Sequence, residues 1–122
     1  MYRENHDWGF HMEDLIGKRI LSISKSFDSI YLELENYTCV FEHLQDCCES
    51  VNLEDWEYYE EDFQNAVIHD IEWASNDDPD ACESGTWTFL KIRTSKGYGW
   101  FRWYGTSNGY YSEGVDFRAY KK

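Results

Sequence analysis

Proline is almost absent from this chain of 122 residues, and no apolar run is long enough to cross a bilayer. The first ten residues, MYRENHDWGF, lack the basic and apolar regions of a secretion signal. We therefore expect one soluble, intracellular domain spanning residues 1–122. In a chain without a secretion signal, cysteines are expected as thiols or ligands and not as a disulfide framework. We interpret Cys39, which lies in an alternating segment, as packing.

Signature motifs of catalysis are also lacking. We identify no serine nucleophile elbow, no H-E-x-x-H helix, no phosphate-binding glycine loop and no dinucleotide fingerprint. Adjacent carboxylates such as Glu60 and Glu61 are more typical of a solvated face than of an acid and base couple. These absences predict that the protein is not an enzyme.

Cations are missing from the middle of the sequence. Residues 26–90 contain 18 Asp or Glu and no Lys or Arg, and the whole chain has a net charge of −13. Such a field repels phosphate backbones and attracts Lys- and Arg-lined protein surfaces. We therefore predict an acidic surface that binds a basic partner protein and not nucleic acid; the alternative is an acidic face that only keeps the protein soluble. The candidate partner-binding residues are Glu54, Asp55, Glu57, Glu60, Glu61, Asp62, Asp77, Asp78 and Asp80.

Alternation of apolar and polar residues is frequent and predicts a mainly antiparallel β-sheet. Ile30, Leu32 and Leu34, for example, fall on one face of an expected strand. Segments 11–17 and 57–65 predict two short helices, so the expected fold class is α+β. Strands are expected over residues 18–24, 29–35, 37–43, 50–56, 67–73, 86–94, 98–104 and 111–120.

Two parts of the chain echo each other. Residues 14–23 align with 62–71, and residues 47–54 align with 110–117. The echo predicts two pseudo-repeated halves, each a helix followed by a meander of about four strands. The alternative is a chance similarity between two β-meanders. Only the first half has adjacent cysteines at the aligned position, which suggests a local function there.

The segment EHLQDCCES, residues 42–50, concentrates residues that can bind a metal. Thiolate and imidazole are the ligands of structural zinc, and the His-x3-Cys spacing brings two of them across a tight turn. Adjacent cysteines point to opposite sides of an extended chain, so both bind one ion only if the backbone curls there. Zinc is thus the candidate cofactor; the alternatives are buried or idle thiols, and a metal-dependent enzyme or sensor centred on this cluster. A disulfide between the two neighbours is disfavoured. The candidate ligands are His43, Cys47, Cys48 and Cys82, with His69 or Asp46 as substitutes for the last.

An aromatic stretch at residues 98–104, together with Lys91, Arg93 and Arg102, resembles a stacking platform for single-stranded nucleic acid. The alternative is a hairpin packed into the core. The field of the remaining molecule opposes the nucleic-acid interpretation.

Three motifs resemble a known family: DCCESVNLED (46–55), GTWTFLKIRTSKGY (85–98) and RWYGTSNGYYSEGVDF (102–117). They are similar to small phage and prophage proteins catalogued as domain of unknown function 7448, over about residues 14–117. The resemblance implies phage origin and no named chemistry. Small acidic phage proteins are often inhibitors of host defence, and in size and charge this chain is similar to the type II-A anti-CRISPR proteins that inhibit Cas9. The resemblance thus implies Cas9 as the partner, the host cytoplasm as the location, and blocked loading of guide RNA or target DNA as the mechanism.

Overall fold

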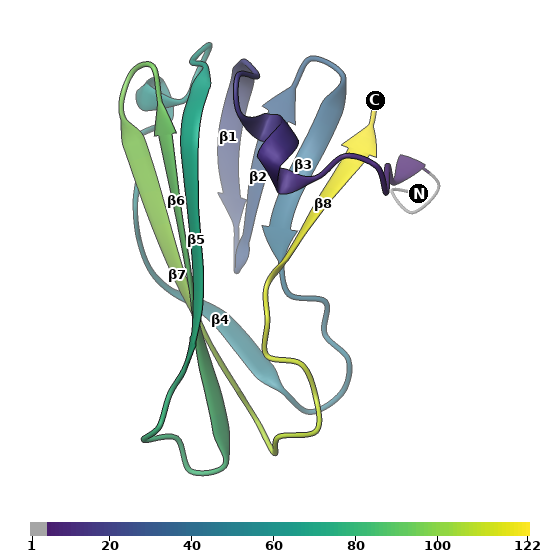
Figure 1. Cartoon of the computed structure of the whole chain (residues 1–122), viewed down its shortest axis with the longest axis vertical. Helices are drawn as coiled ribbons and strands as arrows, with labels where there is room; N and C mark the ends of the chain where they lie inside the picture. Colours follow the sequence, from purple (N-terminus) through teal and green to yellow (C-terminus); the bar gives the residue numbers. More distant parts are fainter. Residues whose placement is uncertain (1–4) are drawn as a thin grey trace.

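Two four-stranded antiparallel sheets face each other in the computed structural model, which describes residues 5–122 (Figure 1). The first sheet has the strand order β1-β2-β3-β8 and the second the order β4-β7-β6-β5. The strands of the first sheet are Ile20–Ser26 (β1), Ser29–Leu34 (β2), Tyr37–Glu42 (β3) and Asp116–Lys121 (β8). Those of the second are Ser50–Glu57 (β4), Ile68–Asp77 (β5), Ser84–Thr94 (β6) and Tyr98–Ser107 (β7).

The predicted α+β fold with two short helices is wrong, because the structure is a β-sandwich. The two helical segments are single 3-10 turns, Met12–Leu15 (η2) and Glu60–Asp62 (η3). Each turn places one apolar anchor in the core: Leu15, the last residue of the first turn, and Phe63, directly after the second, are completely buried. One turn is enough to bury one side chain, whereas an α-helix needs an apolar stripe over several turns to be stable. Within residues 5–122 no helix is long and apolar enough to span a membrane.

The two halves of the chain have the same topology. Each half has a 3-10 turn and four strands, and its fourth strand, β4 or β8, joins the sheet of the other half. The segments that lead into β1 and β5 exchange equivalent hydrogen bonds: Gly17 N donates to Ile68 O, and Asn65 N donates to Ile20 O, both at 2.8 Å. Gly17 and Asn65 also share a left-handed backbone, with φ of 88° and 60°. Residues 14–23 and 62–71, which align in sequence, therefore have equivalent local structures.

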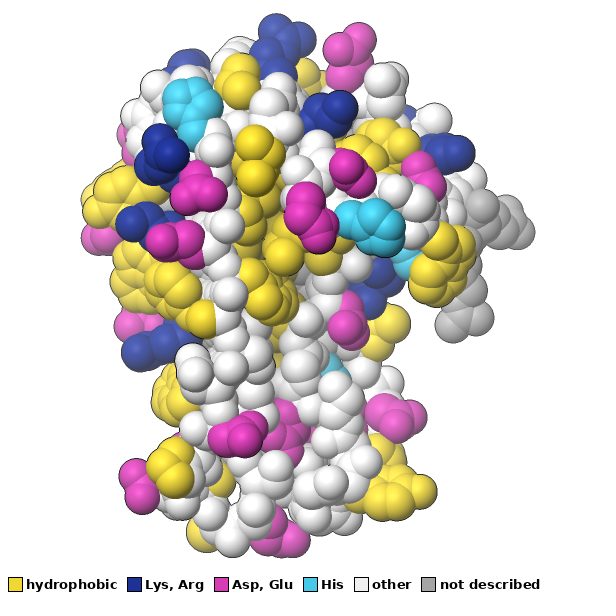
Figure 2. Space-filling view, viewed as in Figure 1, with side chains coloured by type: hydrophobic (Ala, Val, Ile, Leu, Met, Phe, Trp, Pro, Cys, Tyr) yellow, Lys and Arg dark blue, Asp and Glu magenta, His cyan; other side chains and the backbone are white. Residues whose placement is uncertain are grey.

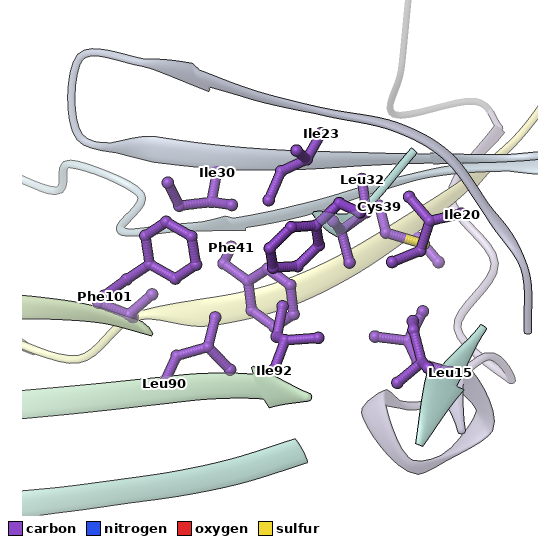
Figure 3. Packing of buried hydrophobic residues seen from close by; sticks show 14 of the residues in the cluster. Leu15, Ile20, Ile23, Ile30, Leu32, Cys39, Phe41, Leu90, Ile92 and Phe101 are labelled. Atoms are coloured by element: carbon purple, nitrogen blue, oxygen red, sulfur yellow. The ribbon is translucent and has the colours of Figure 1, made fainter. Parts of the chain in front are cut away.

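The core lies between the two sheets (Figure 3). Ile30 and Phe41 from the first sheet are fully buried against Leu90 and Phe101 from the second. Cys39 is buried there too, so its interpretation as packing is confirmed. This layer of alternating inward side chains holds the sheets together.

A buried tryptophan ties the second sheet to the first. Trp103, on β7, has almost no exposed surface, and its indole N–H donates to Asp28 O at 2.7 Å. Asp28 lies in the hairpin between β1 and β2, and one of its carboxylate oxygens accepts from Leu53 N of β4 at 2.9 Å. A buried indole is stable only when its N–H has such a partner. These bonds set the position of β4 and β7 relative to the first sheet.

Three connections leave the sandwich at the same end, the lower one in Figure 1. They are residues 43–49 between β3 and β4, 78–83 between β5 and β6, and 108–115 between β7 and β8. We call these three connections the loop end. Loops that a rigid sandwich brings together are frequent carriers of binding sites.

Candidate functional site at the loop end

A pocket of about 630 Å³ opens at the loop end, beside the last residues of β7. Its walls combine carboxylates, hydroxyl groups, the sulfur atoms of two cysteines and the rings of two tyrosines. The lining includes Cys48, Asp80, Cys82, Glu83, Tyr104 and Tyr111. Such a mixture of polar groups and aromatic faces suits a polar or cationic ligand better than an apolar one.

A buried contact between a histidine and a glutamate holds the first connection of the loop end. His43 Nε2 lies 2.7 Å from Glu49 Oε2, and His43 Nδ1 lies 2.6 Å from Gly114 O. Both ring nitrogens thus face oxygen atoms, which fixes the orientation of the ring. The N–H groups of Cys47 and Asp46 also donate to Glu49. These donors, led by Cys47 N–H, outweigh the effect of burial and lower the pKa of Glu49 to about 2.

A second buried glutamate occupies the matching place in the other half. ESVNL at 49–53 corresponds to EGVDF at 113–117, and both glutamates are buried. Thr86 Oγ1 donates to Glu113 Oε1 at 2.8 Å, and the Ser107 hydroxyl donates to Glu113 Oε2. Burial by itself would raise the pKa of Glu113, but the hydroxyl donors lower it overall. The alignment made from the sequence was one residue out of register here, so it missed this pair of glutamates.

The letters of a nucleophile elbow, G-x-S-x-G, do occur at residues 105–109, and the sequence analysis missed them. In a hydrolase this motif joins a strand to a helix and aims the serine at a histidine. Here β7 ends at Ser107 and the chain enters the 108–115 connection, which contains no helix. The Ser107 hydroxyl donates to Glu113 and accepts from Gly109 N at 2.9 Å. The serine therefore serves to anchor the loop.

The four predicted metal ligands all belong to the loop end, but their donor atoms do not form one set. Cys48 and Cys82 line the same pocket, whereas both ring nitrogens of His43 are already engaged. The structure joins Cys47 to Cys48 as a disulfide, contrary to the expectation of free thiols. Within residues 5–122 no three His, Cys, Asp or Glu side chains are arranged to hold a metal ion. As placed, these residues do not fit a tetrahedral zinc site; the zinc content of the purified protein is the direct test of that prediction.

The predicted partner-binding carboxylates fall into two groups at different places. The first group lies on β4 and η3 and comprises Glu54, Asp55, Glu57, Glu60, Glu61 and Asp62. The second group lies at or beside the loop end and comprises Asp77, Asp78 and Asp80. Cations accompany the first group: Arg102 Nη2 lies 3.4 Å from Asp55 Oδ2, and Lys25 Nζ lies 4.3 Å from the centre of the Trp56 ring.

The loop end, in contrast, has no cation in any of its three connections. Figure 2 shows acidic side chains and no Lys or Arg over the lower part of the face in view. Exposed Asp46 and Glu83, which were not among the predicted partner-binding residues, join Asp80 in the loop end. Asp78 is held in place because Tyr104 Oη donates to it at 2.6 Å, which lowers the pKa of Asp78. The structure thus concentrates unpaired negative charge at one end of the sandwich.

The fold and site define an all-β sandwich with two topologically equivalent halves and an acid-lined pocket among the loops of one end. By sequence, the chain belongs to the family described as Domain of unknown function (DUF7448), whose model matches residues 13–117. The family resemblance is therefore confirmed, and phage origin and Cas9 inhibition stay predictions. No curated protein and no solved structure matches the chain.

Proposed function

We propose that this protein is a non-enzymatic binding protein whose loop end docks onto a basic surface of another protein. The observation that carries the proposal is the convergence of three cation-free connections around one pocket. Opposite charge across an interface speeds encounter and selects partners. The carboxylates of these connections are Asp46, Glu49, Asp78, Asp80, Glu83 and Glu113.

The pocket supplies a place for a cationic side chain of the partner. Asp80 and Glu83 line it and can accept charge-assisted hydrogen bonds from a guanidinium or an ammonium group. The rings of Tyr104 and Tyr111 line it as well and attract a cation through their faces. A Lys or Arg on the partner would therefore meet both kinds of interaction at once. A phosphate group would be repelled by the same carboxylates.

The buried glutamates support a binding function over a catalytic one. A general acid or base needs a pKa near the working pH and a free position for the proton. The pKa values of Glu49 and Glu113 are both lowered, and their oxygens already accept bonds from the protein. We infer that the two glutamates shape the loops that carry the exposed acids.

The particular partner that the family resemblance suggests is Cas9. Its nucleic-acid channel is basic, and a protein that occupies the channel excludes guide RNA or target DNA. The loop end of this protein, acidic and without cations, has the charge that such a channel selects.

Cleavage of a target DNA by Cas9 in the presence of the protein tests this partner. The double variant Asp80→Asn, Glu83→Gln should inhibit more weakly, and the inhibition that remains should depend less on salt. The matched control is Glu60→Gln, Glu61→Gln, which removes the same charge in η3, outside the loop end, and should inhibit like the wild type. Cutting that is undiminished at excess protein excludes Cas9.

The wider proposal is tested by capturing proteins from a host lysate with the wild type and with the two double variants. We expect a basic protein that elutes with rising salt, that is lost with Asp80→Asn, Glu83→Gln, and that is kept by the control. Equal capture by both double variants would contradict binding through the loop end.

A further inference from the structure

The outward face of the β4-β7-β6-β5 sheet is an aromatic platform. On β7 the side chains alternate, so Trp100 and Tyr104 point away from the core, and β6 contributes Trp87 and Phe89 in the same way. Trp87 and Tyr104 are cross-strand partners with ring centroids 4.4 Å apart, and the rings of Phe89 and Trp100 are 6.3 Å apart and stacked. In the aromatic stretch at residues 98–104, the side chains therefore point alternately into the core and onto the outward face of the sheet.

A hollow of about 380 Å³ lies on this platform, lined by Phe89, Lys91, Tyr98, Trp100 and Arg102. Lys91 Nζ is 5.0 Å from the centre of the Tyr98 ring, and Arg102 Cζ is 4.8 Å from that of Trp87. The hollow therefore offers ring faces with hydrogen-bond donors beside them.

Cations and carboxylates alternate on the platform, with one carboxylate, Glu57 opposite Trp100, in excess. Each cation has a carboxylate directly across from it on the neighbouring strand: Arg93 opposite Asp70, Lys91 opposite Glu72, and Arg102 opposite Asp55. Figure 2 shows apolar, basic and acidic side chains alternating along the left edge of the view, where this sheet lies. An anionic chain would meet carboxylates on both edge strands, so the charge pattern suits a neutral ligand with many hydroxyl groups.

The fold itself does not require these aromatics. β2 and β3 are the central strands of the other sheet and match β6 and β7 in the repeated topology. Their outward positions include one aromatic residue, Tyr31 on β2, beside Glu33 and Thr38, whereas those of β6 and β7 include five: Trp87, Phe89, Tyr98, Trp100 and Tyr104. A large aromatic surface on one of two equivalent sheets is therefore an added feature, of the kind that marks an interaction site.

A second copy of the chain is a poor match for this face. Two sheets related by a two-fold axis in their interface place β4 opposite β4, or β4 opposite β5. In both arrangements carboxylates meet carboxylates, because Asp55 and Glu57 lie on β4, and Asp70 and Glu72 lie on β5. Like charges in contact disfavour self-association.

We propose that the outward face of the β4-β7-β6-β5 sheet binds a neutral oligosaccharide. The apolar face of a sugar ring would lie on Trp100, and its hydroxyl groups would donate to the carboxylates and accept from Lys91 and Arg102. The hollow of the platform shares no lining residue with the pocket at the loop end, so this site is distinct from the basic-protein site proposed above. Tyr104 lines that pocket and forms the edge of the platform.

An array of immobilised neutral glucans, mannans, galactans and xylans, in α and β linkages, provides the test. The full-length chain should be retained by at least one of these polymers, and isothermal titration with the soluble hexasaccharide of that polymer should give its affinity. Trp100→Ala should weaken binding about tenfold or more, as expected when an aromatic platform residue is removed. Tyr98→Ser should also weaken it; Tyr98 is 49% exposed, so this variant leaves the core intact.

The matched control is Phe27→Ala, because Phe27 is 88% exposed but lies in the β1–β2 hairpin of the other sheet. It should bind the glycan like the wild type. The variant Asp80→Asn, Glu83→Gln should also keep glycan binding, which separates this site from the loop end. Retention by none of the polymers overturns the proposal. If no glycan binds, two other results would show what the platform binds instead. One is binding of oligo-dT that is lost with Trp100→Ala; the other is dimerisation, measured by sedimentation, that is lost with the same variant.

Discussion

Replacing Gly105 with alanine should destabilise the protein by overpacking the layer beneath the loop end. A Cβ at this position would lie 2.8 Å from Glu113 O, 2.9 Å from Glu113 Cβ and 2.9 Å from Val51 Cγ2. One of these atoms is backbone, so it cannot rotate away. Overpacking of this kind costs about 1–3 kcal/mol. For a chain of this length each kcal/mol corresponds to about 3–6 °C, so the melting temperature should fall by roughly 3–18 °C.

Urea unfolding followed by tryptophan fluorescence, together with a thermal melt, measures this change. The matched control is Gly114→Ala, where the added Cβ would meet only Ser112 Oγ at 3.6 Å. That is ordinary van der Waals contact, so the free energy of unfolding should change by no more than about 0.5 kcal/mol. Equal stability of the two variants would refute the close packing of β7 against the 108–115 connection. Below the melting temperature, Gly105→Ala should also weaken binding at the loop end, because Glu113 must move.

Further measurements address the buried acids and the cysteines. The pKa of Glu49 is lowered from 4.5 to about 2, so its contribution to stability is complete above pH 4.5 and is lost as the pH falls towards 2. The variant Glu49→Gln should therefore make the free energy of unfolding less dependent on pH in this range. Iodoacetamide should modify exposed Cys82 in the native protein but not Cys39, whose burial raises its pKa to about 12; a native protein with Cys39 modified would contradict the buried position. The hydrogen bond to Asp78 raises the pKa of Tyr104 to about 12, so Asp78→Asn should lower the pKa of this phenol in a spectrophotometric titration, and an unchanged titration would exclude the bond.

Alternation along the chain was sufficient to locate most strands. Residues 29–35 and 37–43 were expected as strands, and β2 and β3 are Ser29–Leu34 and Tyr37–Glu42. Each strand has one face in the core and one face outside it, so apolar and polar residues alternate along consecutive positions. This alternation can be recognised from the sequence alone. The last strand was expected from residue 111, but β8 begins at Asp116. The difference arises because Glu113 is bonded to Thr86 and Ser107 and holds the chain out of the sheet.

The candidate site could be predicted only in part. The histidine and cysteines of the 43–49 connection were singled out, and the structure places Cys48 and Cys82 on one pocket. The contacts of the His43 ring were not predictable, because one of them is to the carbonyl of Gly114, 71 residues away in sequence. The platform on β6 and β7 was recognised as aromatic and basic, but the carboxylates that offset its cations lie on β4 and β5, which only the fold brings alongside.

By itself, the sequence determined that the protein is acidic, rich in strands and built from two similar halves. The tertiary structure alone decided that β4 and β8 exchange sheets, and with them which loops meet at one end. It also decided which carboxylates remain without a cation, since the predicted acidic residues separated into a group beside Arg102 and Lys25 and a group at the loop end. The physical reason is that charge and alternation are properties of neighbouring residues, whereas strand exchange depends on core packing between segments far apart in the chain.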